Sequence, residues 1–402
     1  MQKITRSLVQ KNTTRIVLVV LDGLGGLPVN GKSELEAAHT PNLDALARTS
    51  ACGLHVPVAL GITPGSGPGH LSLFGYDPVE FQIGRGILEA LGLGMEIRKT
   101  DVALRCNYAT IEDGIIGDRR AGRIPTDQSR ILTEKLQAAV SRIGDAEVAF
   151  APGMEHRFAV RFRFPDSLPP DAARINDTDP QKEGLAPAPP VGETPSAQHV
   201  AQVADAFISR VSSVLKNEKK ANYALLRGFS VMPHLLTFQE AYGLTSLAVA
   251  VYPMYRGIAK LIGMEAPEVS GDVADELAFL KDKFDDHDFF FMHVKKVDSY
   301  GEDGNFEEKK KRIEEFDVLL PRILELRPDV LIITGDHSTP ALMKGHSWHP
   351  VPALLKSPYV FGGLCSGFSE RECFRGELGI FPTTSLMTLA LANAGRLRKF
   401  GA

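Results

Sequence analysis

Residues Arg15 to Gly26 read RIVLVVLDGLGG, a continuous apolar run, rich in β-branched side chains, that ends in an acid and three glycines. A run of this kind without alternation is typical of a strand that is buried on both faces of a parallel sheet. Loops at the carboxyl ends of such strands form the ligand sites of open α/β sheets, so Asp22 stands where chemistry is expected. The stretch predicts the central strand of an α/β fold.

Four later segments resemble this strand, and a polar loop follows each of them. The expected strands are residues 223–226, 247–251, 288–294 and 330–334. The loops after them contain, in order, Arg227, Arg256, Lys295 with Asp298, and Asp336 with His337. Because the carboxyl ends of the strands in one parallel sheet lie at one edge, acids and histidines from both ends of the sequence are expected to meet there.

An amphipathic helix is expected soon after the first strand, beginning at Thr40 and Pro41. Threonine is a favoured N-cap residue, and proline fits the first helical position. Leu43, Leu46 and Ala47 would then share the face that covers the sheet.

The middle of the chain differs from both ends. Its segments are shorter, and Phe158, Val160, Phe162 and Phe164 alternate as in a half-buried antiparallel strand. Residues 180–195 are rich in proline and glycine and predict a loop through which the chain returns to the core. We therefore expect a discontinuous core of residues 1–94 and 183–402 and an inserted, smaller α+β domain of residues 95–182. A chain of 402 residues with 44% hydrophobic residues is large enough for two such lobes.

The composition argues against several classes of protein. The formal net charge is -4 and no long run of Lys or Arg occurs, so neither nucleic acid nor an anionic membrane is an expected partner. The early apolar run, residues 16–21, is too short for a signal sequence or a membrane span. Cys52, Cys106, Cys365 and Cys373 lack CxxC spacing, which argues against a disulfide framework or a zinc knuckle. We expect a cytoplasmic protein with buried thiols.

Residues 65–70 read GSGPGH and offer a serine nucleophile. Ser66 lies between glycines and just before an apolar run, as expected at the start of a helix, where the positive end of the helix dipole favours an anion. The alternative is that Ser66 serves only as an N-cap. As a nucleophile it needs activation, and since no base is close in sequence, a metal ion that lowers the pKa of its hydroxyl is the expected device.

Candidate metal ligands follow several of the predicted strands. For any one of them a solvated turn is the alternative, but their common position at strand ends makes coincidence a weaker explanation for the whole set. A mixture of carboxylates and imidazoles suits Mn²⁺, Mg²⁺ or Zn²⁺ better than a metal that prefers thiolates. The candidates are Asp22, Asp298, Glu302, Asp336, His337, His346 and His349.

These motifs, taken with others, resemble a known family. The longest is ITPGSGPGHLSLFGYDP from Ile62 to Pro78, and the others are RGILEALG from residue 85, DRRAGR from 118, NDTDP from 176, GDHSTP from 335 and HSWHPVP from 346. Together they run over nearly the whole chain and resemble the cofactor-independent phosphoglycerate mutases of archaeal type. That family belongs to the alkaline phosphatase superfamily.

The resemblance implies an alkaline-phosphatase-like α/β core, with a mostly parallel sheet flanked by helices. It also implies an enzyme of glycolysis and gluconeogenesis that interconverts 2-phosphoglycerate and 3-phosphoglycerate through a phosphoserine, without 2,3-bisphosphoglycerate. Two divalent metal ions are expected, with Mn²⁺ first and Mg²⁺, Co²⁺ or Zn²⁺ as alternatives.

Position by position, the resemblance assigns one metal to Asp22, Ser66, Asp336 and His337, with Ser66 as the nucleophile. It assigns the second metal to Asp298, the residue four beyond it, and His346. The chain departs from the archaeal pattern at three positions. It has Glu302 where archaeal members have histidine, Gly67 where members often have aspartate, and His349 in place of a commoner aspartate. His349 is therefore a candidate ligand or proton donor in compensation.

Substrate contacts must handle a phosphate and a carboxylate, and guanidinium groups bind both in bidentate fashion. For any single arginine a solvated surface charge is the alternative. The predicted contacts in the inserted lobe are Arg120, Arg123, His156, Arg157 and Asp179. Those at the strand ends of the core are Arg227, Arg256 and Lys295.

The expected reaction is a double displacement in which the glycerate is retained while the inserted lobe closes and excludes water. A metal-dependent phosphatase or phosphodiesterase shares the two-metal core, and the arginines of residues 119–123 favour the mutase over it. A phosphotransferase acting on another small metabolite and a non-catalytic metal-binding protein are further alternatives. The oligomeric state is not predicted.

Overall fold

The computed structural model describes residues 2–233 and 235–401. The chain separates into two compact units, the first built from residues 1–82 and 235–402 and the second from residues 83–234. The second unit is therefore longer than the inserted domain of residues 95–182 that the sequence predicts. Residues 183–233 account for most of the difference, because a helix and a strand in this stretch pack on the sheet of the second unit.

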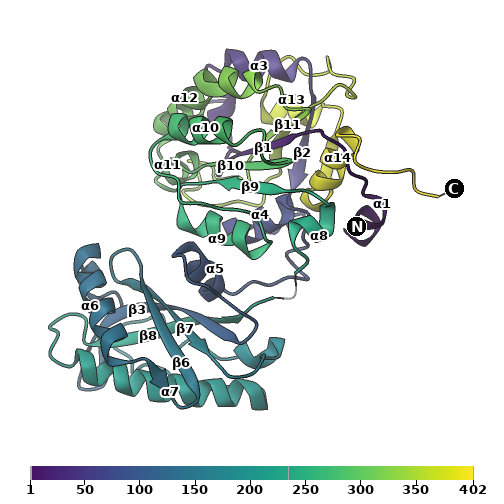
Figure 1. Cartoon of the computed structure of the whole chain (residues 1–402). Helices are drawn as coiled ribbons and strands as arrows, with labels where there is room; N and C mark the ends of the chain where they lie inside the picture. Colours follow the sequence, from purple (N-terminus) through teal and green to yellow (C-terminus); the bar gives the residue numbers. More distant parts are fainter. Residues whose placement is uncertain (1, 234, 402) are drawn as a thin grey trace. The chain divides into compact units, whose positions relative to one another are not determined.

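The first unit is built on a seven-stranded, mostly parallel sheet with the strand order β13-β2-β12-β11-β1-β10-β9 (Figure 1). β1 pairs in parallel with β10 and β11, β9 is parallel to β10, and β12 runs antiparallel to both of its neighbours. Every residue of β1 is fully buried, which confirms the central strand predicted from the sequence. The strands are β1 Ile16–Leu21, β2 Ala51–Val56, β9 Ser246–Val249, β10 Phe289–Val294, β11 Val330–Thr334, β12 Val351–Lys356 and β13 Gly379–Pro382.

Helices cover this sheet (Figure 1). Apolar side chains of α3, α10 and α12 join one core cluster with Val17, Val19 and Leu21. The helices of this unit are α1 Gln2–Leu8, α2 Glu34–Ala37, α3 Pro41–Ala47, α4 Ser66–Leu73, α8 Phe238–Tyr242, α9 Pro253–Leu261, α10 Val273–Asp282, α11 Lys296–Glu302, α12 Phe306–Glu325, α13 Glu370–Phe374 and α14 Leu386–Asn393, with a 3₁₀ turn at Thr383–Ser385.

The predicted helix near residue 40 is present as α3, and its three predicted inner residues are buried. Thr40 stands at the N-cap position but makes no capping hydrogen bond through its side chain. The cap is instead supplied from α12, where the Asp317 carboxylate accepts hydrogen bonds from the N–H groups of Leu43 at 2.7 Å and Asn42 at 3.2 Å. A carboxylate at this position accepts hydrogen bonds from unpaired N–H groups and interacts favourably with the helix dipole.

The second unit is an α+β domain around a six-stranded antiparallel sheet with the order β4-β3-β7-β6-β5, in which β8 also pairs with β3. β7 carries Phe158, Val160 and Phe162, all fully buried, as the alternation predicted. Its elements are α5 Arg85–Gly92, β3 Asp101–Glu112, β4 Ile115–Asp118, η1 Ala121–Arg123, α6 Thr126–Ala139, β5 Arg142–Ile143, β6 Ala146–Pro152, β7 Arg157–Arg163, η2 Pro170–Ala173, α7 Pro195–Leu215 and β8 Tyr223–Val231.

Two predictions about the path of the chain are wrong. The expected strand at residues 223–226 is present, but as part of β8 it belongs to the second unit, and Arg227 belongs there with it. The proline-rich stretch 180–195 does not return the chain to the core, because it leads into α7, which packs on the same second unit.

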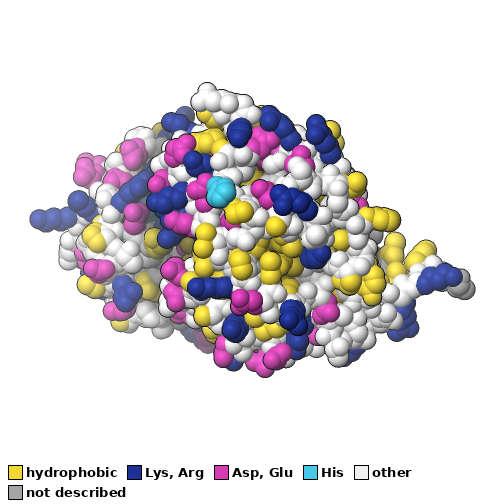
Figure 2. Space-filling view, turned by 90° about the horizontal axis from the view of Figure 1, so that it is seen from above, with side chains coloured by type: hydrophobic (Ala, Val, Ile, Leu, Met, Phe, Trp, Pro, Cys, Tyr) yellow, Lys and Arg dark blue, Asp and Glu magenta, His cyan; other side chains and the backbone are white. Residues whose placement is uncertain are grey.

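No helix among the described residues is long and apolar enough to cross a membrane. On the face seen in Figure 2, basic and acidic side chains are interspersed rather than gathered into a patch of one sign. The four cysteines are buried, as predicted, and occur as free thiols.

Candidate active site

The loops after β1, β10 and β11 bring acids and histidines together at the carboxyl edge of the first unit's sheet. Ligand atoms from Asp22, Asp336 and His337 lie within 4.8 Å of one another, and so do those from Asp298, His337 and His346. His337 belongs to both groups, so the two groups are adjacent. The structure thus has the convergence that the strand pattern predicts.

Glycine at position 23 permits this close packing of loops. Gly23 has a φ of +66°, and a Cβ there would lie 2.6 Å from Thr339 Oγ1 and 2.9 Å from Asp298 Oδ1. Any side chain would clash with both neighbouring loops and would strain the backbone. The glycine therefore allows Asp22 to stand beside the other two loops.

Ser66 is the first residue of α4, as expected, and Gly65 occupies the N-cap position, so the alternative that Ser66 serves only as an N-cap is wrong. Ser66 Oγ lies 3.2 Å from His337 Nε2. The start of α4 touches the loop after β11, because a Cβ on Gly69 would lie 2.6 Å from the carbonyl oxygen of Asp336. A half-buried hydroxyl at a helix N-terminus, beside the two ligand groups, is positioned to receive a phosphoryl group.

The hydrogen bonds of His337 determine which of its nitrogens carries the proton. Thr339 Oγ1 donates its single proton to Asp298 Oδ1 at 2.8 Å, because a carboxylate can only accept. Thr339 Oγ1 must then accept from His337 Nδ1, which lies 2.9 Å away. The lone pair of His337 is therefore on Nε2, which faces Asp22 Oδ1 at 3.4 Å and Asp336 Oδ2 at 3.2 Å.

His346 is arranged in the same way. Its Nδ1 lies 3.0 Å from the carbonyl oxygen of Pro64, which can only accept a hydrogen bond. The lone pair on Nε2 then faces Asp298 Oδ1 at 3.6 Å and Glu302 Oε1 at 3.7 Å. The rings of His337 and His346 stack with their centroids 3.6 Å apart.

The pKa values of the carboxyl groups in this site are shifted in different directions. Burial alone would raise the pKa of Asp22, but His293 and Lys295 hold that pKa well below its ordinary value. Lys295 Nζ lies 3.1 Å from Asp22 Oδ2 and also pairs with Asp298 Oδ2. Burial and the charges of Asp22 and Asp298 raise the pKa of Asp336 well above its ordinary value.

These residues fit divalent cations. Asp22 Oδ1 and Asp336 Oδ2 are buried and have no hydrogen-bond partner. Imidazole lone pairs that point at carboxylate oxygens would repel them unless a cation lies between. Metal-ligating histidines generally donate their other N–H to a fixed acceptor, as His337 and His346 do here. The oxygen-rich donor set favours Mn²⁺ or Mg²⁺ over a metal that prefers thiolates.

Three buried residues of the site were not predicted. His293 Nε2 lies 3.3 Å from Asp22 Oδ2, and Tyr255 donates its hydroxyl proton to the same oxygen. His70 Nδ1 donates to the carbonyl oxygen of Ser66 at 2.8 Å. His70 lies within the GSGPGH motif, so the sequence carried a signal for it, whereas His293 is embedded in the apolar strand β10 and Tyr255 lies within α9.

His349 and Arg256 are among the predicted residues that stay outside the two ligand groups, and so is Glu302, whose Oε1 lies 3.7 Å from His346 Nε2. The ring of His349 stacks on Trp348, and its Nδ1 contacts Ser347 Oγ at 3.1 Å. Arg256 is buried in α9 and donates to the carbonyl oxygen of Val251 at 2.7 Å, so it holds the loop after β9.

The second unit has its own cluster of arginines. A cavity of about 310 Å³ is lined by residues of α5, β3 and β8 and by the loop that carries Asp177. Burial lowers the pKa of Arg105 despite the acid Glu89, and the positive charges of Arg157, Arg85 and Arg227 lower it further. A guanidinium group whose pKa is lowered by neighbouring positive charges favours an anionic ligand. The lining residues are Arg85, Arg105, Asp177, Gln181, Arg227 and Gly228.

The predicted residues of the second unit join this cluster. The pKa of His156 is lowered to about 4 by burial and then by the charge of Arg157, with smaller contributions from Arg120 and Arg123. Asp179 is buried and forms a bidentate ion pair with Arg119, with two N···O distances of 2.7 Å. Asp179 Oδ2 also lies 3.4 Å from Arg227 Nη1.

The backbone that carries these arginines is strained. Ala121, Gly122 and Arg123 have φ values of +49°, +63° and +49°, so three consecutive residues are left-handed. The Asp118 carboxylate holds the turn by accepting from the N–H groups of Arg120 at 2.7 Å and Gly122 at 2.6 Å. Strained non-glycine residues that are held in this way are concentrated at functional sites.

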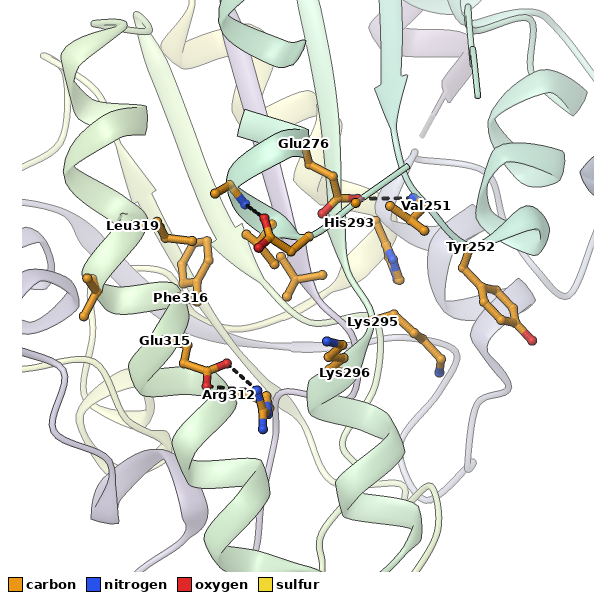
Figure 3. Close-up of a pocket in the computed structure, with 16 residues that line it drawn as sticks. Val251, Tyr252, Glu276, His293, Lys295, Lys296, Arg312, Glu315, Phe316 and Leu319 are labelled. Carbon is orange, nitrogen blue, oxygen red and sulfur yellow. Dashed lines mark hydrogen bonds and ion pairs between the residues drawn. The ribbon is translucent and has the colours of Figure 1, made fainter. Parts of the chain in front are cut away.

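A larger cavity of about 580 Å³ adjoins the first unit's site between α10, α12 and the end of β10 (Figure 3). Its walls are mainly apolar, with Phe316 and Leu319 among them, while His293 and Lys295 connect it to Asp22. Glu276 also lines it and accepts from the N–H of Val251 at 3.2 Å (Figure 3). Burial raises the pKa of Glu276 to about 8, so its carboxyl is largely neutral near pH 7.

The fold and the site together define a two-unit α/β enzyme whose first unit gathers acids and histidines at the carboxyl edge of a mostly parallel sheet. A family model described as 2,3-bisphosphoglycerate-independent phosphoglycerate mutase matches residues 47–221. A relative from Aquifex aeolicus, named a probable enzyme of that kind, is 58% identical over 401 residues, which cover 98% of each chain. The chain belongs to the family of 2,3-bisphosphoglycerate-independent phosphoglycerate mutases.

Solved structures agree with this assignment. A cofactor-independent phosphoglycerate mutase from Thermoplasma acidophilum is 30% identical, with a TM-score of 0.76 over 95% of this chain and 100% of that one. A protein from Pyrococcus horikoshii is 28% identical, with a TM-score of 0.82 over 98% of this chain and 100% of that one.

Proposed function

We propose that this chain interconverts 2-phosphoglycerate and 3-phosphoglycerate in the cytoplasm by passing the phosphoryl group through Ser66. The observation that carries the proposal is the position of Ser66 Oγ, at the start of α4 and 3.2 Å from His337 Nε2, beside two groups of carboxylates and imidazoles. Membership of a family named for this activity supports the substrate.

In the first half of the proposed reaction, the Ser66 hydroxyl gives up its proton and its oxygen forms a bond to phosphorus while the bond to the glycerate oxygen breaks. Backbone N–H groups at the start of α4 face the phosphoryl oxygens, and Lys295 supplies a nearby positive charge. The glycerate oxygen takes up a proton as it leaves. In the second half the other hydroxyl of the retained glycerate gives up its proton and its oxygen forms a bond to phosphorus, while the bond to Ser66 breaks and the serine oxygen takes up a proton.

Divalent cations, with Mn²⁺ as our first choice, would lower the pKa of the Ser66 hydroxyl and neutralise the charge of the phosphoryl group. The donor set described above fits two such ions. The proposed ligands of one are Asp22, Ser66, Asp336 and His337, and those of the other are Asp298, Glu302 and His346.

The arginines of the second unit are the proposed carboxylate-binding residues. Arg157 and Arg227 lie close enough to lower the pKa of Arg105, and Arg120 and Arg123 lower that of the neighbouring His156. A mutase must hold the dephosphorylated glycerate and keep water from the phosphoserine, whereas a phosphatase need not. This cluster therefore favours a mutase over a phosphatase.

The test is a coupled assay of the purified protein with 3-phosphoglycerate and Mn²⁺, without 2,3-bisphosphoglycerate. We expect 2-phosphoglycerate to form with little release of inorganic phosphate. If phosphate is released at the rate at which substrate is consumed, the protein is a phosphatase. If neither product forms, while another phosphorylated metabolite is turned over, the proposed substrate is wrong.

A further inference from the structure

A buried lysine of α12 contacts both loops that carry the candidate ligands Asp22 and His337. Lys309 is fully buried, and its Nζ donates to the carbonyl oxygens of Gly23 at 2.9 Å, Gly25 at 3.0 Å and Thr339 at 2.9 Å. Gly23 directly follows Asp22, and Thr339 lies two residues after His337. One nitrogen atom therefore connects the loop after β1 to the loop after β11.

The three contacts also fix the charge of this lysine. Carbonyl oxygens can only accept hydrogen bonds, so three of them require three N–H donors. A neutral amine has two such donors and an ammonium group has three. The geometry therefore identifies Lys309 as an ammonium ion.

Two carboxylates, the buried Glu34 and the half-buried Glu370, lie near this ammonium group and hold the residues that flank the same loops. Burial lowers the pKa of Lys309, and Glu34 and Glu370 are the acids whose charges most oppose that lowering. Glu370 Oε1 accepts from the N–H of Gly26 at 2.8 Å, and Glu34 Oε1 accepts from that of Ala341 at 2.7 Å. Charge-assisted hydrogen bonds in a dry interior are stronger and more rigid than those on a surface.

We propose that Lys309 is a positioning residue that fixes the distance between the Asp22 loop and the His337 loop and thereby sets the affinity of the site for divalent cations. The inference rests on the proposed function, because it assumes that these residues bind cations. Outer hydrogen bonds of this kind typically contribute 10-fold to 100-fold to metal affinity.

The test is a titration of metal-free protein with Mn²⁺, in which free Mn²⁺ is followed by electron paramagnetic resonance and no activity is measured. We expect Lys309→Met, which keeps the length of the side chain, to weaken Mn²⁺ binding by about 10-fold to 100-fold. At saturating Mn²⁺ the KM for 3-phosphoglycerate should stay near the wild-type value, because the proposed carboxylate-binding arginines lie in the other unit. If Lys309→Met does not fold, Lys309→Gln, whose amide keeps two N–H donors, takes its place.

Arg396→Met is the matched control, since it also removes a buried cation from the first unit. Arg396 donates to the carbonyl oxygen of Thr14 at 2.6 Å and to Asp288 Oδ1 at 2.8 Å, before the starts of β1 and β10 and so at the opposite edge of the sheet. We expect this variant to lose stability and to keep its affinity for Mn²⁺.

Three results would overturn the inference. If Lys309→Met binds Mn²⁺ as tightly as the wild type, the lysine does not position the ligands. If Arg396→Met weakens binding to the same degree, the effect is general destabilisation. If the wild-type protein itself does not bind Mn²⁺, the cation sites of the proposed function are wrong and this inference falls with them.

Discussion

Ser66→Ala and Ser72→Ala each remove a hydroxyl oxygen from α4, yet we expect the two variants to rank in opposite orders for stability and for mutase activity. Ser66 Oγ is half-buried, lies 3.2 Å from His337 Nε2 and makes no capping bond. Losing one such hydrogen bond costs about 0.5 to 1.5 kcal/mol of stability. Ser72 is fully buried, and its hydroxyl donates to the carbonyl oxygen of Pro57. Removing it leaves that buried acceptor unpaired, which costs about 1 to 3 kcal/mol.

Ser66→Ala, the more stable of the two variants, should be the less active one. A covalent nucleophile has no substitute, so Ser66→Ala should lose mutase activity by at least about a thousandfold. Ser72→Ala should keep most of its activity although it is the less stable variant. The measurements are the coupled mutase assay at saturating Mn²⁺ and the denaturant midpoint of each variant. If Ser66→Ala retains more than a few per cent of wild-type turnover, or if activity simply follows stability in the two variants, Ser66 is not the nucleophile.

Three further predictions concern cations, arginines and pH. Exhaustive chelation should abolish turnover and added Mn²⁺ should restore it; full activity in protein shown to be metal-free by elemental analysis would contradict the proposed cation sites. Arg123→Ala should raise the ratio of phosphate release to mutase turnover by roughly tenfold, because a hydrogen bond to the retained glycerate is lost. As the control, Arg142→Ala changes an exposed arginine and should leave that ratio unchanged. An equal ratio in both variants would mean that Arg123 is only a surface charge. The folded protein holds the pKa of Glu276 at about 8, above its ordinary 4.5. This group therefore stabilises the fold fully below pH 4.5 and loses that contribution as pH rises through 8. Glu276→Gln should make the denaturant midpoint fall less steeply with pH, and an unchanged slope would show that the carboxyl is not neutral in the folded state.

Local sequence pattern was sufficient to predict the core of the site. The apolar run at residues 16–21 could only be a buried strand, and parallel pairing brings the ends of β1, β10 and β11 to one edge. Asp22, Asp298, Asp336 and His337 then converge because topology requires it. The apolar strand pattern is local in the sequence, and the convergence of parallel strand ends is a general rule of α/β sheets, so both can be applied without the structure.

Features that depend on tertiary packing were not predictable in the same way. The sequence of an apolar strand such as residues 223–226 does not show which of two sheets the strand joins. The prediction that it belongs to the first unit is therefore wrong. Lys309 lies in a run of charged residues that is typical of an exposed helix face, although it is fully buried. His293 is hidden in the apolar sequence of β10. Only the packing of neighbouring loops shows that these side chains have polar surroundings.

Peptide mass spectrometry of acid-quenched enzyme shows whether the phosphoryl group passes through Ser66. Mn²⁺-loaded protein should be mixed with 3-phosphoglycerate in the absence of 2,3-bisphosphoglycerate and quenched within a few turnovers. The account predicts phosphate on the peptide that contains Ser66, and its absence from the Ser66→Ala protein treated in the same way. Phosphate on another residue during turnover, or equal labelling of the two proteins, would contradict it.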